Sequence, residues 1–308
     1  MSSGNTSKII LTIVGIFAGG IILLVAIAVF SVSGLFSDSS EDDSDYSSSL
    51  SSGSKIGLVD ITGEIFSSDD YVKQIEAFRE SGNVRALLVR VNSPGGSVAP
   101  SQEIYESIRA FRESGKPVVI SMNSVAASGG YYLALGGTTI MANSGTITGS
   151  IGVIIQYPQV KPLMDKIGVE VVTVKSGKFK DVGSPFRQQT TEDLAYLQNV
   201  INDTYDQFVE AVAIERNLSL DSAKALAEGK IYTGRQAMKN GLVDTIGTFE
   251  DAVKLAGKLA GISGKPELIK KRKQERFFDR LLGTDTESMS AIRDIFISKP
   301  IVQYRMYP

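Results

Sequence analysis

Short apolar runs alternate with helical stretches along residues 55–265, and this alternation constrains the fold more than any other feature. The runs are rich in Val and Ile and are typical of strands buried on both faces. They cover residues 56–60, 86–91, 118–121, 139–142, 151–155 and 169–174. Strands that alternate with helices favour an α/β fold with a mostly parallel sheet and right-handed crossovers. Residues 55–265 are enough for one sizeable domain.

Two of the intervening stretches have the apolar period of a helix. Over 101–114, apolar residues recur on one face, and Gly115 follows as a stop signal. A longer helix is expected after Thr190, because two acidic residues stand in its first turn, where they complement the helix dipole. Its apolar positions are spaced three or four residues apart: Leu194, Leu197, Ile201, Tyr205, Phe208 and Val212.

Residues 9–30 carry no charged side chain, and this run is longer than the roughly 20 residues that cross a bilayer as a helix. Lys8 precedes it, so the positive-inside rule places residues 1–8 in the cytoplasm. A cleaved signal peptide is the alternative, but its apolar region is typically about 7–15 residues, and the Ala-Ile-Ala motif at 26–28 lies inside the run. We therefore expect a retained transmembrane helix that anchors the chain in the cell membrane as a single-pass protein, with the folded part on the extracytoplasmic side.

The segments that flank residues 55–265 have different compositions. Residues 31–54 are rich in Ser and Asp, which predicts a disordered linker. Residues 266–308 form a tail that is basic first and apolar later. Its basic cluster at 270–276 fits a solvated helix with one edge on the core better than a membrane-surface patch. Residues 301–308 could form a strand added to a neighbour or a frayed end.

The absence of two residue types restricts the chemistry. The chain has no Cys, which excludes disulfides, thiol nucleophiles and cysteine-ligated zinc. It has no His, which excludes a Ser-His-Asp triad, His-liganded metals and an imidazole base. A net charge of -2 gives no support for a nucleic-acid-binding protein. If the protein is an enzyme, its proton carrier is Lys, Asp, Glu or Tyr.

Four segments could supply catalytic groups, and each ends or adjoins a predicted strand. They are Asn-Ser-Pro-Gly-Gly-Ser at 92–97, the small-residue segment 124–132, the Gly-rich segment 145–153 and the lysine-rich segment 175–181. In parallel α/β sheets, sites assemble at the carboxyl ends of strands. Backbone amides of the first segment could stabilise an oxyanion.

Each segment also has a purely structural interpretation. The first fits an ordinary strand-to-helix turn, and it lacks the spacing of a phosphate-binding loop. Ser128 stands among small residues, as a nucleophile requires, but such a serine is more often a close-packing residue. Ser150 could be a second nucleophile candidate, an orienting hydroxyl or a turn residue. Most lysines, including those of 175–181, are solvated surface charges.

Without histidine, a serine hydroxyl can be activated only by a carboxylate or an amine, and lysine is the known alternative partner. A lysine must be neutral to accept a proton, and only about one free lysine in 2,500 is neutral at pH 7. Lowering its pKa by roughly 3 units requires about 4 kcal/mol, which burial in an apolar site can supply. A Ser–Lys site therefore needs a dry groove.

The four segments together resemble the signal peptide peptidase A family, membrane-anchored serine proteases of the ClpP/crotonase superfamily. The stretch Ile-Tyr-Thr-Gly-Arg-Gln-Ala at 231–237 and the Gly-Leu-Val-Asp that follows also resemble this superfamily. Each motif is weak alone, but their order and separation behind an apolar N-terminal run make a specific signal. The resemblance covers about residues 56–260 and implies a ClpP/crotonase-like fold. It does not extend to the tail.

The resemblance implies roles for individual residues. Ser128, in Ala-Ser-Gly-Gly, matches the nucleophile, and Lys180, in Lys-Ser-Gly-x-x-Lys-Asp, matches the general base. Ser150 matches the serine that orients the lysine. Gly96 and Gly129 match the glycines whose amides bind the oxyanion, with the first glycine of the 95–96 pair as an alternative to Gly96.

The function that the resemblance implies is hydrolysis of apolar peptides, such as remnant signal peptides, by a Ser–Lys endopeptidase. Two alternatives share the fold: a crotonase-like enzyme acting on acyl-thioesters, and a non-catalytic membrane scaffold. The expected partners are peptide substrates, the membrane and further copies in a homo-oligomeric ring, with no nucleic acid. No cofactor and no metal are expected.

Overall fold

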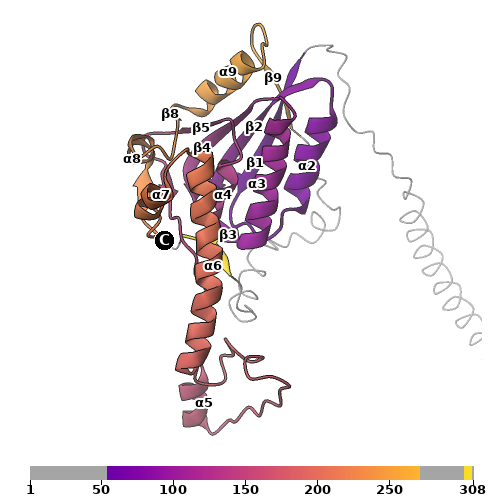
Figure 1. Ribbon diagram of the computed structural model, residues 1–308. Helices are drawn as coiled ribbons and strands as arrows, with labels where there is room; N and C mark the ends of the chain where they lie inside the picture. Colours follow the sequence, from indigo (N-terminus) through magenta and orange to yellow (C-terminus); the bar gives the residue numbers. More distant parts are fainter. Residues whose placement is uncertain (1–53, 271–301, 307–308) are drawn as a thin grey trace, which may run out of the picture. The chain divides into compact units, whose positions relative to one another are not determined.

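The computed structural model of the protein describes residues 54–270 and 302–306 (Figure 1). The strands are β1 (Lys55–Thr62), β2 (Val84–Ser93), β3 (Gly95–Ser97), β4 (Val118–Ala127), β5 (Thr139–Ala142), β6 (Ile147–Gly149), β7 (Ile231–Thr233), β8 (Thr245–Ile246), β9 (Glu267–Lys270) and β10 (Gln303–Arg305). The helices are α2 (Asp69–Glu80), α3 (Val98–Glu113), α4 (Gly129–Ala134), α5 (Lys161–Ile167), α6 (Thr191–Glu215), α7 (Leu220–Leu226), α8 (Gly234–Lys239) and α9 (Phe249–Leu259).

A mostly parallel sheet forms the centre of this part of the chain. Its strand order is β7-β6-β4-β2-β1-β9, and β5 extends it by pairing with β4 and β8. Every pairing in it is parallel except β6 with β7. The short strands β3 and β10 form a separate antiparallel pair. The α/β fold class is therefore confirmed, and the architecture is consistent with a ClpP-like fold.

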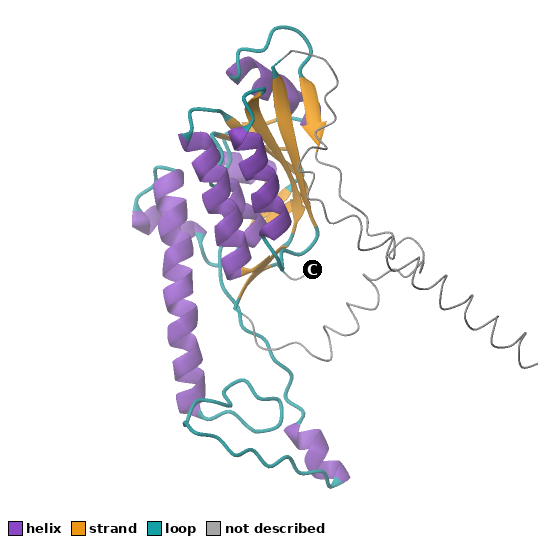
Figure 2. Ribbon diagram, turned by 90° about the vertical axis from the view of Figure 1, so that its right-hand side faces the viewer, coloured by secondary structure: helices purple, strands orange, loops and turns teal. Residues whose placement is uncertain are grey.

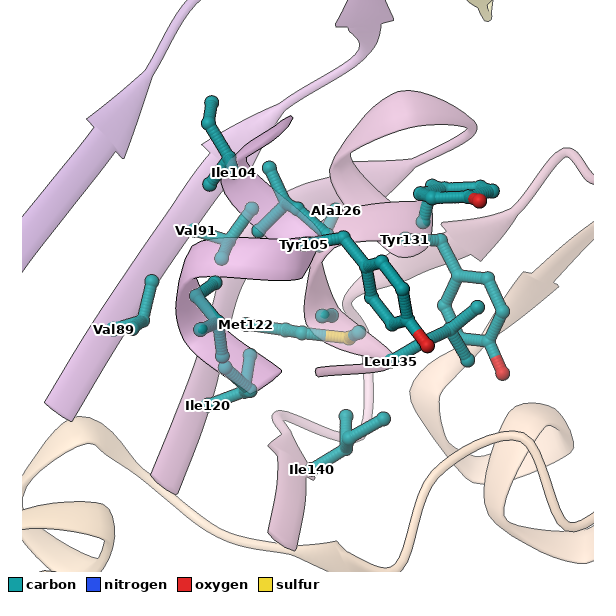
Figure 3. Packing of buried hydrophobic residues seen from close by; sticks show 14 of the residues in the cluster. Val89, Val91, Ile104, Tyr105, Ile120, Met122, Ala126, Tyr131, Leu135 and Ile140 are labelled. Atoms are coloured by element: carbon teal, nitrogen blue, oxygen red, sulfur yellow. The ribbon is translucent and has the colours of Figure 1, made fainter. Parts of the chain in front are cut away.

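Helices cover both faces of the sheet, so its central strands are apolar on both sides. Helices α2, α3 and α4 pack on one face, where Val89, Val91, Ile120 and Met122 meet side chains of α3 (Figures 2 and 3). The other face carries a smaller cluster that packs against α9. Burial on two sides explains why β1, β2 and β4 have nearly continuous apolar sequences.

The long helix α6 begins where its sequence predicts. The Thr190 side chain accepts a hydrogen bond from the Asp193 amide, and the Asp193 carboxylate accepts one from the Thr190 amide. This reciprocal capping box satisfies two amides that the first helical turn leaves without partners. The helix spans 25 residues, and α5 lies with the 168–190 loop at its N-terminal end, beyond the sheet (Figures 1 and 2).

The strands predicted over 56–60, 86–91, 118–121 and 139–142 are confirmed as β1, β2, β4 and β5. Two further strand predictions are wrong. Residues 151–155 form only an isolated bridge, and residues 169–174 are an exposed loop. An apolar run is compatible with a strand, but residues 151–155 pair with Gln303 only at Ile154, and residues 169–174 have no strand partner among the described residues.

Several predictions concern residues outside the described ones, namely the N-terminus 1–8, the apolar run 9–30 and almost all of the linker 31–54. Among residues 54–270 and 302–306, no helix has the length and apolarity needed to cross a bilayer. The tail is described only in part. Its first residues form β9 beside β1, a strand that the sequence does not predict. Near the C-terminus, the strand alternative is confirmed, because β10 pairs with β3 of the same chain.

The two-sided burial of the sheet predicts a large cost for cavities in β2. The Leu88→Ala variant should lower the free energy of unfolding by about 2–5 kcal/mol, because Leu88 is fully buried between two neighbouring strands. The measurement is urea unfolding at fixed protein concentration. The matched control Ile214→Ala removes an aliphatic side chain that is 75% exposed and should change stability by less than about 0.5 kcal/mol. Equal losses in both variants would contradict this account of the core.

Candidate active site

Ser128 lies at the sharp turn between β4 and α4, in a backbone conformation that is unusual for a residue with a side chain. Its φ is 54° and its ψ is -117°, although it is not glycine. Such conformations cost of order 1–3 kcal/mol and occur mainly where the surrounding structure imposes them. Here the Ser128 amide donates to the Gly149 carbonyl at 2.8 Å, and the Ser128 carbonyl accepts from the amides of Tyr131 and Tyr132.

The Ser128 hydroxyl is buried and has no hydrogen-bond partner among the described residues. A serine at the start of a helix usually caps it by accepting from a backbone amide two or three residues on, but Ser128 makes no such bond. A buried hydroxyl without a partner is costly and calls for an explanation. Its unused donor and acceptor capacity is what a nucleophile would need.

The first glycine-rich segment lies directly beside this turn. A Cβ added at Gly95 would lie 2.7 Å from the Gly129 nitrogen, and one added at Gly129 would lie 3.2 Å from the Gly96 nitrogen. Gly95 also has a φ of +103°. Only glycine fits such an approach of two backbones. The structure thus brings together the predicted oxyanion segments, 92–97 and 128–130, from the ends of two neighbouring strands.

The two glycines of the first segment use their amides differently. The Gly95 amide donates to the Ser93 hydroxyl at 3.1 Å, within its own turn. Gly96 pairs instead with residues outside the turn, Ile65 on one side and Tyr304 of β10 on the other. The Gly95 amide is thus used within its own turn, whereas Gly96 lies opposite Tyr304 of β10.

Ser150 directly follows β6, next to the Ser128 turn. β4 and β6 are paired in parallel up to Ala127 and Gly149, so the two serines follow neighbouring strand ends. Ser150 also has a positive φ, 51°, and its amide donates to the Lys230 carbonyl at 2.7 Å. Ser128 and Ser150 are neighbours in space and both have a positive φ, so backbone strain is concentrated where β4 and β6 end.

Within one chain, Lys180 does not lie with Ser128, Ser150 and the two glycines. It lies in the 168–190 loop and is exposed, and the Ser128 hydroxyl has no hydrogen-bond partner there or elsewhere in the described residues. The loop lies at the end of α6 that is distant from the sheet (Figures 1 and 2). Of the residues that the sequence assigns to the site, the structure therefore brings together Ser128, Ser150, Gly96 and Gly129, but not Lys180.

Ion pairs hold the base of this loop to α6. Arg187 contacts Asp181 at 2.8 Å and Asp193, in the first turn of α6, at 2.5 Å, while Lys175 contacts Asp181 at 2.6 Å. The hydrogen bonds from Arg187 and Lys175 lower the pKa of Asp181 to about 2. Asp181 thus stays ionised, and the loop that carries Lys180 is attached to the helix.

We name α5 and the following loop to Gln189 the α5 lobe (residues 161–189). Many of its apolar side chains face solvent, with Val174 96% exposed, and no residue of α5 is buried. The large exposed ones are Leu163, Ile167, Val169, Val171, Val172, Val174, Phe179 and Phe186. So many large apolar side chains facing solvent on one segment are unusual for a soluble protein surface.

Comparisons with known proteins place the chain among peptidases. The profile of peptidase family S49 matches residues 110–263, and the Clp protease profile matches residues 40–148. A putative protease of Synechocystis is 43% identical over 236 residues, which cover 76% of this chain and 84% of that protein.

Two further relatives are longer than the matched region. A putative signal peptide peptidase of Enterococcus faecium is 40% identical over 204 residues, 64% of this chain and 59% of that protein. Protease 4 of Haemophilus influenzae is 35% identical over 216 residues, 67% of this chain and 35% of that protein. The chain therefore spans less than two thirds of these two proteins.

The strain at Ser128 predicts that replacing this residue by glycine stabilises the protein, although it removes the proposed nucleophile. Ser128→Gly should raise the free energy of unfolding by about 1 kcal/mol, because glycine adopts this conformation without the steric cost. Ser128→Ala is the matched control, since it also removes the hydroxyl but keeps the Cβ, and it should gain less. Urea unfolding of both variants checks this. A glycine variant less stable than the alanine variant would show that the turn is not strained.

Proposed function

The chain belongs to peptidase family S49 and is a serine-type peptidase, and we propose that Ser128 is its nucleophile and Lys180 its general base. The observation that carries the proposal is the buried Ser128 hydroxyl, which has no partner among the described residues and lies where two glycine backbones meet. No histidine is available to activate it, so an amine is the remaining base of suitable strength.

In the proposed reaction, neutral Lys180 accepts the Ser128 proton as the hydroxyl oxygen attacks the scissile carbonyl carbon. The amides of Gly96 and Gly129 stabilise the resulting oxyanion. Lys180 then gives the proton to the leaving amine, and a water that it activates hydrolyses the acyl-enzyme. Ser150, beside the Ser128 turn, orients the lysine amine by a hydrogen bond.

The Lys180 amine must be shielded from solvent to act as a base, since a solvated lysine is charged at neutral pH. Its exposed position on an apolar lobe supports delivery to a second copy of the chain. We infer that the α5 lobe of one copy docks on its neighbour, buries its apolar side chains there and places Lys180 beside the neighbour's Ser128. A heterologous contact of this kind closes into a ring when the rotation permits. The Clp-like fold is consistent with such an assembly.

The proposed substrates are apolar peptides, including remnant signal peptides. The E. faecium relative supports this, because its name describes a putative signal peptide peptidase. The apolar run 9–30 would anchor the catalytic domain in the cell membrane, on the extracytoplasmic side. At that location, signal peptides left in the bilayer are close to the site.

A fluorophosphonate probe tests the assignment of the nucleophile and the base. Labelling should occur on Ser128, disappear in Ser128→Ala and fall by at least about a hundredfold in Lys180→Ala, because the base is lost. Lys178→Ala is the matched control: Lys178 lies on the same loop and pairs with Glu192, so its loss should leave labelling unchanged.

The other outcomes of the labelling experiment are also decisive. Labelling that persists in Ser128→Ala but disappears in Ser150→Ala would reverse the roles of the two serines. A folded wild-type protein that neither labels nor cleaves peptides would contradict the proposal and favour a non-catalytic scaffold.

Mixing two inactive variants tests whether Lys180 acts on a neighbouring copy. When Ser128→Ala and Lys180→Ala chains are co-expressed in equal amounts, random assembly should restore about a quarter of the wild-type sites, since one contact in four joins an intact serine to an intact lysine. Peptide hydrolysis by the purified mixture measures this. Activity that stays at the level of the separate variants would show that both residues act within one chain.

A further inference from the structure

The two residues that flank Lys180 in the chain are each held by a specific contact. Phe179, on one side, stacks on Tyr196 of α6, with 4.9 Å between the ring centroids and an angle of 16° between the rings. Asp181, on the other side, forms an ion pair with Arg187 at 2.8 Å. The chain is therefore held immediately before and immediately after Lys180.

Arg187 joins the loop to α6 with the two ends of its guanidinium group. Its Nη2 atom donates to the Asp181 carboxylate at 2.8 Å, and its Nη1 atom donates to the Asp193 carboxylate at 2.5 Å. Asp193 is itself buried and fixed by the capping box of α6. It lies three residues before Tyr196, so both contacts are made to one face of the helix. The planar fork of arginine suits two carboxylates, whereas a lysine ammonium is a single point charge.

The same contacts keep the Asp181 carboxylate occupied. It accepts a hydrogen bond from Lys175 at 2.6 Å in addition to the one from Arg187. Lys180, next to it in the chain, is exposed and makes no ion pair with any described residue. An amine that pairs with a carboxylate is stabilised in its charged form and is a poorer proton acceptor. The ion pairs of Asp181 thus leave the Lys180 amine without an acidic partner in the described part of the chain.

We propose that Arg187 and Tyr196 are positioning residues for the general base. They hold Asp181 and Phe179 on α6, so that the amine of Lys180 is presented in one place to the serine on which it acts. The inference rests on the proposed function, since it concerns the base of the same site, and both residues act through Lys180. Placement matters because a displacement of about 1 Å in a catalytic group can cost roughly a hundredfold in rate.

Steady-state peptide hydrolysis by full-length variants tests the part played by Arg187. Arg187→Ala should lower kcat by about a hundredfold and leave KM within about twofold, because the base is displaced while peptide binding is untouched. Arg187→Lys should recover part of the loss, with kcat about tenfold below that of the wild type, since an ammonium can hold one carboxylate but not both. This variant keeps the positive charge and therefore also serves if Arg187→Ala does not fold.

Arg109→Ala is the matched control for Arg187→Ala. Arg109 also contacts two carboxylates, those of Glu106 and Glu113, but all three residues lie on α3. Its loss removes a similar set of charges from a helix surface that does not hold the lysine loop. The kcat of Arg109→Ala should therefore stay within about twofold of the wild-type value.

The ring of Tyr196 is tested by a second pair of variants. Tyr196→Ala removes the stack on Phe179 and should lower kcat by about tenfold with an unchanged KM. Tyr196→Phe keeps the ring and should bring kcat back to within about twofold of the wild type, because stacking does not need the hydroxyl. A loss of the same size in both variants would contradict the role of the stack.

Mixing variants separates the placement of the lysine from a general loss of structure. When Arg187→Ala and Ser128→Ala chains are co-expressed in equal amounts, about a quarter of the wild-type sites should return, because the Ser128→Ala chain still presents Lys180 to an intact serine. Arg187→Ala mixed with Lys180→Ala should be no more active than the separate variants, since neither chain presents a working base.

The outcomes distinguish the failure of this inference from the failure of the proposed function. Unchanged kcat in Arg187→Ala and Arg187→Lys would overturn the inference, as would a loss that appears in KM instead of kcat. Activity that returns on mixing with Lys180→Ala would also overturn it, because the defect would then lie with the serine. The proposed function itself fails if wild-type Ser128 does not react with the fluorophosphonate or if Lys180→Ala stays active.

A base that acts within its own chain would leave both Arg187→Ala mixtures inactive. In that case the kcat and KM values of the two Arg187 variants decide the inference, because they do not depend on which copy supplies the lysine.

Discussion

The site depends on one close approach of two backbones, where the Gly95–Gly96 turn after β2 meets the Ser128 turn after β4. A Cβ at Gly95 would lie 2.7 Å from the Gly129 nitrogen, and one at Gly129 only 2.5 Å from the Ser101 hydroxyl oxygen of α3, so both positions require glycine. The parallel pairing of β2 with β4 brings these ends to the same edge of the sheet, and the pairing of β4 with β6 brings Ser150 beside them. The packed core thus fixes the positions of the proposed nucleophile and of the proposed oxyanion amides.

The sequence predicts this half of the site because the relevant information is local. Strands buried on both faces leave continuous apolar runs, and a Gly- or Ser-rich turn after such a run marks the edge at which sites form. The start of α6 is also predictable from local sequence, because its capping box is formed by Thr190 and Asp193. Short strands such as β3, β6 and β10 have three residues each, too few for any period, and their partners define them.

Predictions from the sequence fail where the burial of a segment depends on contacts that its amino-acid composition does not specify. Residues 169–174 are apolar enough to suggest a strand, yet in the single chain they are an exposed part of the α5 lobe. The resemblance implies Lys180 as the base from its motif, but a motif says nothing about the copy on which the residue acts. Nothing in residues 301–308 beyond their apolar, aromatic character indicates that Tyr304 would lie at the glycine amides.

Helix α6 carries two parts of the proposed enzyme. Thr204 and Phe208 in its middle contact Tyr304 of β10, and Asp193 at its N-terminal end holds the loop of Lys180 through Arg187. At 1.5 Å per residue, Asp193 is separated from Thr204 and Phe208 by roughly 17–23 Å of continuous helix. In the proposed assembly, this single helix would therefore connect the packed core of one subunit to the lysine that acts on its neighbour.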